Sequence, residues 1–376
     1  MKLLRLSISL IILIVLSSCI QPLQLEDLGV VISRGVDKNE EEKIEVNMAV
    51  LQFNKDSPST TKTIDGVGET IQGAIKNANT KANQYLANGK LELEIYGRQV
   101  AEEGLEPFID TLRRDANIPS TVFLAVSDTT AKEIFTIDTE KIDINLGQFL
   151  HEIIQPGPEK RLFPVVTFPR FLYTINNSGI EPVLPIMEVK DGNPALSGVA
   201  LFKGDKMVSE LPLKDAILIS IMEGTVRNEI IEITIPKEEL SAELQKDTKR
   251  DRLKMTFIIE QARGNNILTN KEELKYDTKI DLKLNLIEIF PTYKLEEEKV
   301  INDIERAIEK HIKDRYETLL SKLKELNIDT FGYGIKYRIK NKGGKLTAKE
   351  WDELFPKIDT TIDVKAEIIR HGSVHR

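Results

Sequence analysis

Residues 279–290, with the sequence "KIDLKLNLIEIF", carry the clearest structural signal in this chain of 376 residues. Apolar and polar residues alternate there with a period of two, which predicts a β-strand with one buried face. The apolar positions are Ile280, Leu282, Leu284 and Leu286, and the polar ones are Asp281, Lys283 and Asn285. At Leu286–Ile287 the alternation shifts by one residue, which is typical of a β-bulge.

A long helix follows this strand almost at once. Residues 295–328, "LEEEKVINDIERAIEKHIKDRYETLLSKLKELNI", place apolar residues at 301, 304, 308, 312, 319, 323 and 326. This spacing predicts an amphipathic helix, about 50 Å long at 1.5 Å per residue. Residues 229–235, 251–261 and 362–368 also show strand patterns. We therefore expect an antiparallel sheet with one polar face and one face covered by the helix.

The chain as a whole predicts an α+β fold in three modules, each a β-sheet with packed helices. The first, 26–137, begins with two strands around the charged turn "DKNEEEK" and continues with helices and strands of a mixed sheet. The second, 138–224, is rich in proline and contains a hairpin turn at Gly204-Asp205. The third, 225–376, is the antiparallel meander with the long helix.

The first 18 residues have the layout of a secretory signal peptide, with Lys2 and Arg5 before an apolar run. The run is too short for a membrane span, which needs roughly 20 apolar residues. Its end, "LSSC" at residues 16–19, resembles the lipobox of bacterial lipoproteins. That resemblance implies cleavage before Cys19 and attachment of diacylglycerol to its thiol. Residues 19–25 would then tether the protein to a membrane through its acyl chains.

Composition and missing motifs exclude several classes of ligand and active site. Cys19 is the only cysteine, so neither an intramolecular disulfide nor a Cys-based zinc site is expected. The net charge of −8 argues against a nucleic-acid ligand. The GxSxG, GxxxxGK[ST] and HExxH motifs are missing. The histidines are scattered: His151, His311, His371 and His375. We expect His311 to face solvent, and we predict no enzyme activity, cofactor or metal.

Two glycine-containing stretches allow more than one interpretation. "DGVGET", residues 65–70, precedes a helix but lacks the third glycine of the dinucleotide pattern, so it is weak evidence for nucleotide binding. Residues 331–345, "FGYGIKYRIKNKGGK", form a local basic patch. We interpret this patch as a strand edge and loop whose lysines discourage edge pairing. A protein-docking surface is the alternative.

Three stretches resemble the Ger(x)C family of spore germination lipoproteins. They are "LGVVISRGVDK" (28–38), "GRQVAEEGLEPFIDTLRRDANIPSTVFLAVSDTTAKEIF" (97–135) and "DTFGYGIKYRIKNKGGKLTAKEWDELFPKIDTTIDVKAEIIRHG" (329–372). The last is similar to the family's Asp-x-Phe-Gly-x-Gly stretch followed by Trp-x-x-x-Phe-Pro. One departure is Ile20-Gln21 where members commonly have Trp-Asp.

The resemblance implies a non-catalytic lipoprotein subunit of a nutrient germinant receptor. Its partners would be integral membrane receptor subunits, and it would sit on the outer face of the inner spore membrane. Whether it contacts the small-molecule germinant stays open. We interpret the two motifs as structural, with Gly332 and Gly334 in tight backbone conformations. Trp351 and Phe355 lie one helical turn apart and would pack onto the long helix.

Two other classes of function remain as alternatives. One is a solute-binding lipoprotein of a transporter, against which the meander of the last third argues. The other is an envelope hydrolase, which needs an acid, base or nucleophile set that the sequence does not present.

Overall fold

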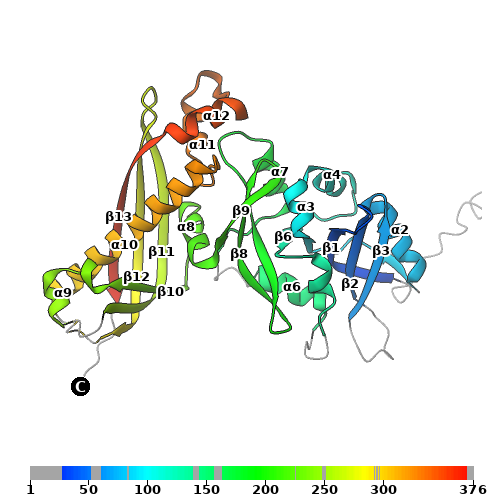
Figure 1. The fold of residues 1–376 in the computed structure, drawn as a ribbon, viewed down its shortest axis with the longest axis horizontal. Coiled ribbons are helices and arrows are strands. Elements are labelled where there is room, and N and C mark those ends of the chain that lie inside the picture. The colour runs from blue at the N-terminus through cyan, green and yellow to red at the C-terminus, as the bar shows by residue number, and fades with distance from the viewer. Residues whose placement is uncertain are drawn as a thin grey trace, which may run out of the picture.

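Two β-sheets with packed helices make up the protein, seen side by side in Figure 1. The structure is a computed structural model that describes residues 28–51, 61–82, 84–138, 144–155, 163–224, 226–247, 251–291, 293, 295 and 297–370. Cys19, the tether, His371 and His375 lie outside the described residues.

The first sheet has nine strands in the order β3-β2-β1-β5-β6-β7-β8-β9, with β4 also paired to β1. β1, β5, β6 and β7 run parallel to one another, whereas the outer strands form antiparallel hairpins. The strands are β1 (Leu28–Lys38), β2 (Ile44–Leu51), β3 (Thr61–Gly68), β4 (Tyr85–Ala87), β5 (Leu93–Tyr96), β6 (Phe123–Ser127), β7 (Val183–Lys190), β8 (Asn193–Lys203) and β9 (Lys206–Pro212). The predicted mixed sheet is confirmed.

Helices cover both faces of this sheet, which is why its central strands are buried almost throughout. One apolar core forms with α2, α3, α4 and α7, and another with α5 and α6 on the other side. The helices are α2 (Ile71–Lys81), α3 (Arg98–Glu103), α4 (Glu106–Arg114), α5 (Ala131–Phe135), α6 (Leu146–Ile154) and α7 (Phe168–Ile175). The predicted turn at Gly204-Asp205 joins β8 to β9, with Gly204 at φ +61°.

The expectation of three modules with one sheet each is wrong for the first two. β6 pairs with β7 through Val126–Ile186 and Ser127–Met187, so the predicted boundary at 137/138 lies inside one continuous sheet. β6 and β7 are separated by a long, proline-rich connection, and the pairing of two strands across such a connection leaves no local pattern in the sequence. The change of sheet falls after α8 (Leu213–Met222), next to the predicted boundary at 224/225.

The second sheet confirms the period-two pattern. Ile280, Leu282, Leu284 and Leu286 are all buried. Leu286 pairs with Phe257 and Glu288 with Thr256, so Ile287 is the extra residue of the predicted bulge. The strands are β10 (Glu229–Pro236), β11 (Arg252–Asn270), β12 (Lys275–Phe290) and β13 (Asp359–Arg370).

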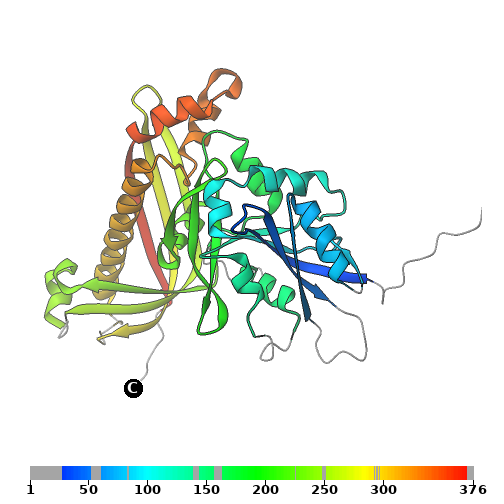
Figure 2. The same ribbon diagram turned by 45° about the vertical axis from the view of Figure 1, so that its right-hand side comes forward.

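The predicted long helix is α10 (Glu298–Glu325), about 42 Å for its 28 residues at 1.5 Å per residue. Figure 2 shows orange α10 and red β13 side by side. Two short elements lie between β10 and β11, namely η2 (Lys237–Glu239) and α9 (Ala242–Asp247), and four lie between α10 and β13: α11 (Tyr333–Lys340), η3 (Lys342–Gly344), α12 (Ala348–Leu354) and η4 (Phe355–Lys357).

Three expectations for this region are corrected. β13 is parallel to β12, because α10 returns the chain to the end of the sheet where β12 began. The basic stretch 331–345 is not a strand edge, since most of it forms α11 and η3. His311 is half-buried instead of facing solvent. Its imidazole lies near the groove between α8 and α10.

Candidate functional site at the seam between the two sheets

The two sheets are joined, backbone to backbone, by two loops that are distant in sequence. One is 176–182, between α7 and β7, and the other is 327–335, which includes the first residues of α11. The Glu181 amide donates to the Asp329 carbonyl at 2.8 Å, and the Ile335 amide donates to the Gly179 carbonyl at 3.0 Å. We call this contact the seam.

The seam depends on residues without side chains. A Cβ on Gly334 would lie 2.3 Å from the Gly179 Cα and 2.6 Å from Cε2 of Trp351. Contacts this short do not occur between real atoms, so any larger residue would push the two loops apart. Gly332 adopts φ +73°, a left-handed conformation that favours glycine and that starts α11. The expected tight backbone conformation is confirmed at Gly332, whereas Gly334 lies inside α11 and is required by its close packing instead.

The Asp329 carboxylate lies at the centre of the seam and is buried. Its Oδ1 accepts from the Tyr333 amide at 3.1 Å, and its Oδ2 accepts from the Gly334 amide at 2.8 Å. The left-handed turn at Gly332 directs these amides at the carboxylate, which caps the N-terminus of α11. Trp351 Nε1 also donates to Oδ2, at 3.0 Å. Burial raises the pKa of Asp329 to about 7, although the hydrogen bonds oppose this shift.

Aromatic rings surround the carboxylate and tie it to the rest of the core. Trp351 packs against Tyr337 of α11 and against Phe355, with ring centroids 5.7 and 5.9 Å apart. Trp351 and Phe355 belong to the same apolar core as the buried face of α10. The Tyr333 ring meets Tyr276 of β12 edge to face at 5.0 Å. The tip of the second sheet is thereby connected to the seam.

A second, partly buried polar group reinforces the seam. Lys203, at the end of β8, places its Nζ 3.1 Å from Oε1 of Glu181 and also contacts the Asp352 carboxylate. The same Nζ donates to the Asn327 carbonyl at 2.7 Å. Burial raises the pKa of Glu181, and the neighbouring Lys203 charge opposes that shift. One lysine therefore bonds to both sides of the seam.

Contacts between α8 and α10 also join the two parts of the molecule. The Tyr316 hydroxyl donates to the Leu218 carbonyl at 2.6 Å, and Arg315 forms an ion pair with Asp215 at 2.8 Å. Figure 1 shows α8 between the two sheets. Since α8 leads directly from β9 towards β10, it belongs to both parts of the molecule.

The Asp329 carboxylate is shielded from solvent by its donors and by aromatic rings, so a substrate cannot reach it. Within the described ranges, no group of three or more histidine, cysteine, aspartate or glutamate side chains could hold a metal ion. In the same part of the chain, no helix is both long and apolar enough to cross a bilayer.

The remaining sequence-predicted positions lie apart from the seam. His151 is on α6, 3.5 Å from Glu92, beside a cavity of about 390 Å³. His311 is on α10, so the two histidines do not form a common site. "DGVGET" lies at the end of β3 and the start of α2, where Thr70 caps the helix by accepting from the Gly73 amide. A further cavity, of about 1110 Å³, lies between α2, β4 and the end of α4.

Sequence reasoning missed a fully buried ion pair in the first sheet. Arg34 of β1 and Glu94 of β5 are direct neighbours, with Arg34 Nε 2.8 Å from Glu94 Oε2. Both side chains are 0% exposed. Arg34 Nη1 and Glu94 Oε1 have no hydrogen-bond partner among the described residues. The available signal was the one charged residue inside the mostly apolar strand "GVVISRGV".

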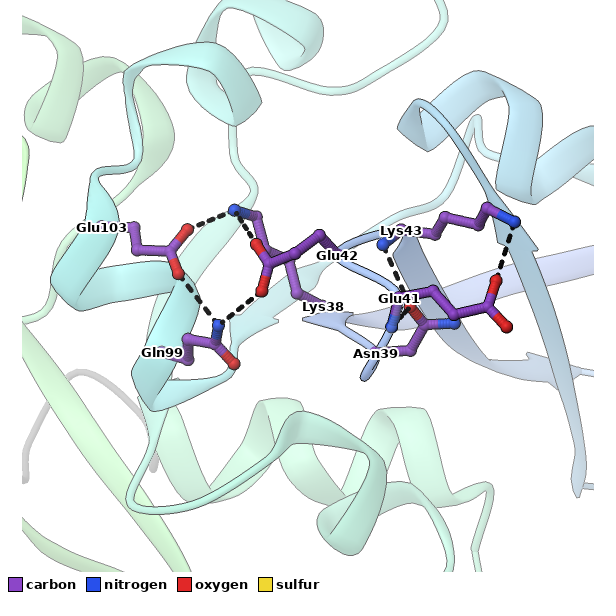
Figure 3. Close-up of polar contacts among 7 residues, drawn as sticks. All are labelled: Lys38, Asn39, Glu41, Glu42, Lys43, Gln99 and Glu103. Carbon is purple, nitrogen blue, oxygen red and sulfur yellow. Dashed lines mark hydrogen bonds and ion pairs between the residues drawn. The ribbon is translucent and has the colours of Figure 1, made fainter.

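The charged turn between β1 and β2 forms a surface network with α3, shown in Figure 3. Lys38 contacts both Glu42, at 3.1 Å, and Glu103. Gln99 donates to Glu103 at 2.9 Å. Asn39 accepts from two backbone amides of the turn and fixes its shape. The exposed ion pairs contribute little to stability, so the main effect of this network is to orient the hairpin against α3.

The chain is similar in sequence to known spore germination proteins. Residues 22–189 match the family described as spore germination protein N-terminal domain, and residues 197–372 match spore germination B3/GerAC like, C-terminal. Spore germination protein GerQC of Bacillus cereus is 21% identical over 364 residues, covering 96% of this chain and 97% of that protein. Putative spore germination protein YfkR of Bacillus subtilis (strain 168) is 22% identical over 387 residues, covering 97% and 95% respectively.

The fold is also similar to a solved structure. The crystal structure of the GerBC protein superimposes with a TM-score of 0.56 at 17% sequence identity, covering 90% of this chain and 98% of that chain. At this level of identity the likeness concerns the fold.

Proposed function

Because this chain belongs to the spore germination GerAC-like family of non-catalytic germinant receptor subunits, we propose that it is a lipid-anchored scaffold. In this proposal it holds the integral membrane subunits together at the outer face of the inner spore membrane. Its acyl chains keep it at high local concentration beside those subunits, so individually weak contacts are sufficient for assembly.

The anchor in this proposal is Cys19. "LSSC" follows an apolar run that is too short to span a bilayer, and two acyl chains hold a protein firmly where one holds it marginally. Mass spectrometry of the mature protein should find diacylglycerol on an N-terminal Cys19. A mature chain that starts elsewhere, or an unmodified thiol, would contradict this part of the proposal.

The seam is the observation that best supports a coupling role. Asp329, Gly179 and Gly334 connect the two sheets through backbone contacts, so a force applied to one sheet is transmitted to the other. A receptor subunit that passes a signal between its partners needs such a rigid joint. The charged groups of the seam have their partners within it: Asp329 accepts from the Gly334 amide and the Trp351 indole, and Glu181 pairs with Lys203, which supports a structural role for them.

The test is germination of spores that carry a deletion or a point mutation. Spores lacking the protein, or carrying Cys19→Ala, should lose the response to one nutrient and still germinate on a non-nutrient trigger. Substitution of His151 by Ala is the matched control and should leave the response intact. If the deletion spores germinate normally on every nutrient, the scaffold proposal fails.

A further inference from the structure

Residues 336–349 form a strongly basic tip on an acidic protein. The segment contains six cations and no acidic residue, whereas the whole chain has a net charge of −8. Since it forms the end of α11, η3 and the start of α12, its lysines do not protect a strand edge. We call it the basic tip. Its cations are Lys336, Arg338, Lys340, Lys342, Lys345 and Lys349.

The basic tip projects into solvent. Nine of the eleven residues from 339 to 349 are exposed. The chain turns there through two left-handed glycines, Gly343 at φ +75° and Gly344 at φ +63°. A Cβ on either glycine would meet no atom of the described residues within 4 Å, apart from those of its chain neighbours. Figures 1 and 2 both show the segment, in orange and red, at the upper end of the second sheet. Its outer side is therefore open to a partner.

The carboxylates of α12 do not neutralise the basic tip. Among the described residues, none of the six cations forms an ion pair. Glu350 accepts from the amide and the hydroxyl of Thr347, both at 2.8 Å, and so caps its own helix. Asp352 contacts Lys203 at the seam. Glu353 is the one remaining carboxylate of α12, so most of the positive charge is left uncompensated.

The neighbouring turn between β11 and β12 is neutral as a whole. It touches α11 through Lys271, whose Nζ lies 5.3 Å from the centre of the Tyr337 ring. Glu273 pairs with Lys275 at 2.5 Å, and Glu272 equals Lys271 in charge. This turn therefore leaves the excess positive charge of the basic tip unchanged.

Helix stability accounts for at most two of the six cations. Arg338 and Lys340 lie in the last turn of α11, where the helix dipole favours positive charge. Lys349 lies in the first turn of α12, where the dipole opposes it. Lys342 and Lys345 lie beyond the end of α11. The remaining cations therefore need a partner outside the fold to explain them.

The kind of cation indicates which partner this is. Arg338 is already bonded, since its Nη1 donates to Asn177 Oδ1 at 3.1 Å, so the available cations are lysines. Protein interfaces are enriched in arginine and depleted in lysine. A lysine ammonium is a hydrated point charge on a flexible stem, and it suits a mobile array of phosphates better than one fixed carboxylate. Groups of four to eight such cations are typical of surfaces that bind anionic lipid.

An exposed aliphatic side chain lies among these charges. Ile339 is 68% exposed, more than any other large apolar side chain of the described residues. It stands between Arg338 and Lys340 in the sequence. Apolar side chains beside cations fit the boundary between the headgroups and the acyl chains of a bilayer.

We propose that the basic tip binds the anionic headgroups of a phospholipid bilayer, with Ile339 at the boundary to the acyl chains. This inference rests on the proposed location at a membrane. The bilayer would then contact the protein at two places, the anchor and the tip. Because α11 begins in the seam, a bilayer bound at the tip also fixes the position of the seam beside it.

The experiment uses the full-length protein in nanodiscs of phosphatidylcholine, titrated with separate vesicles of phosphatidylglycerol or of phosphatidylcholine. The disc holds the protein through an acylated Cys19 or through the apolar leader, so vesicle binding tests the tip alone. Mass spectrometry of Cys19 tests the anchor separately. Phosphatidylglycerol vesicles should bind at least about tenfold more tightly than phosphatidylcholine vesicles, and high salt should weaken this binding. They should also slow amide hydrogen exchange within residues 339–349.

Two double variants with the same change in net charge locate the site. Lys342→Gln with Lys345→Gln should weaken binding to phosphatidylglycerol vesicles about 25-fold, or about fivefold per cation. Lys279→Gln with Lys283→Gln, on the exposed face of β12, should bind like the parent protein.

Three outcomes would overturn the proposal. One is equal binding of the two kinds of vesicle. Another is parent-like binding by the variant at Lys342 and Lys345. The third is binding of soluble polyglutamate to the tip as tightly as of phosphatidylglycerol vesicles at equal charge concentration, which would identify an acidic polypeptide as the partner.

Discussion

Gly179 and Gly334 lie against each other with no side chain between them, although 155 positions separate them in the sequence. A Cβ on Gly179 would stand 2.5 Å from the carbonyl carbon of Gly334, and Gly179 has φ +100°, which other residues rarely adopt. One glycine belongs to the loop before β7 of the first sheet and the other to α11 beside the second.

Replacing Gly334 with Ala should therefore destabilise the protein by about 1–3 kcal/mol, because the new methyl group overpacks the seam. Chemical denaturation measures this change. Gly89→Ala is the control, since the nearest atom to its added Cβ lies 4.0 Å away. Equal stability of the two variants would show that the seam can open without cost.

The stability of the protein should fall as the pH rises from about 4 to 7. A pKa of about 7 for Asp329, against 3.8 for the model carboxyl, means that the fold binds this proton more tightly than the unfolded chain does. The contribution is complete below the unfolded pKa and is lost as the pH rises through the folded one. It amounts to at most about 4 kcal/mol.

Asp329→Asn tests the source of this pH dependence. The variant should lose the slope between pH 4 and 7, and it should also be less stable by about 1–3 kcal/mol, because an amide NH₂ would face backbone or indole donors. Asp363→Asn, on the exposed face of β13, should keep the slope. A slope that persists in Asp329→Asn would assign the effect to another group.

Trp351→Phe should weaken the seam while keeping most of its aromatic packing. Above about pH 7, where Asp329 is ionised, the variant loses an indole hydrogen bond to a buried charged group, which contributes about 1.5–3 kcal/mol. Denaturation followed by circular dichroism measures the loss. Trp351 is the only tryptophan of the chain, so in the parent protein its fluorescence should report opening of the seam directly.

Arg34→Met should be among the most damaging single substitutions, costing about 3–5 kcal/mol, because it leaves the Glu94 carboxylate buried without its partner. Combining it with Glu94→Leu should recover most of that loss, since two apolar side chains replace a desolvated pair. A double-mutant cycle in denaturant gives both values. If the double variant is no more stable than Arg34→Met alone, the ion pair is not the cause.

Much of the local structure could be predicted because it depends on neighbouring residues. The alternation from Ile280 to Leu286, the bulge at Ile287 and the helix now seen as α10 are consequences of which side chains must avoid water within a few residues. The prediction of a strand edge for the basic stretch is wrong because the start of α11 depends on Asp329 and on the left-handed Gly332. Neither of these two effects can be seen in the periodicity of apolar residues.

By itself the sequence determined the period and length of most helices and strands, the α+β class and the family to which the chain belongs. Only the tertiary structure decided that β6 and β7 share one sheet, that β13 runs parallel to β12, and that Gly179 meets Gly334. Strand patterns record which face of a strand is buried, but neither its neighbour nor its direction. Contacts across 155 positions depend on how whole sheets pack, and no local pattern in one chain encodes that.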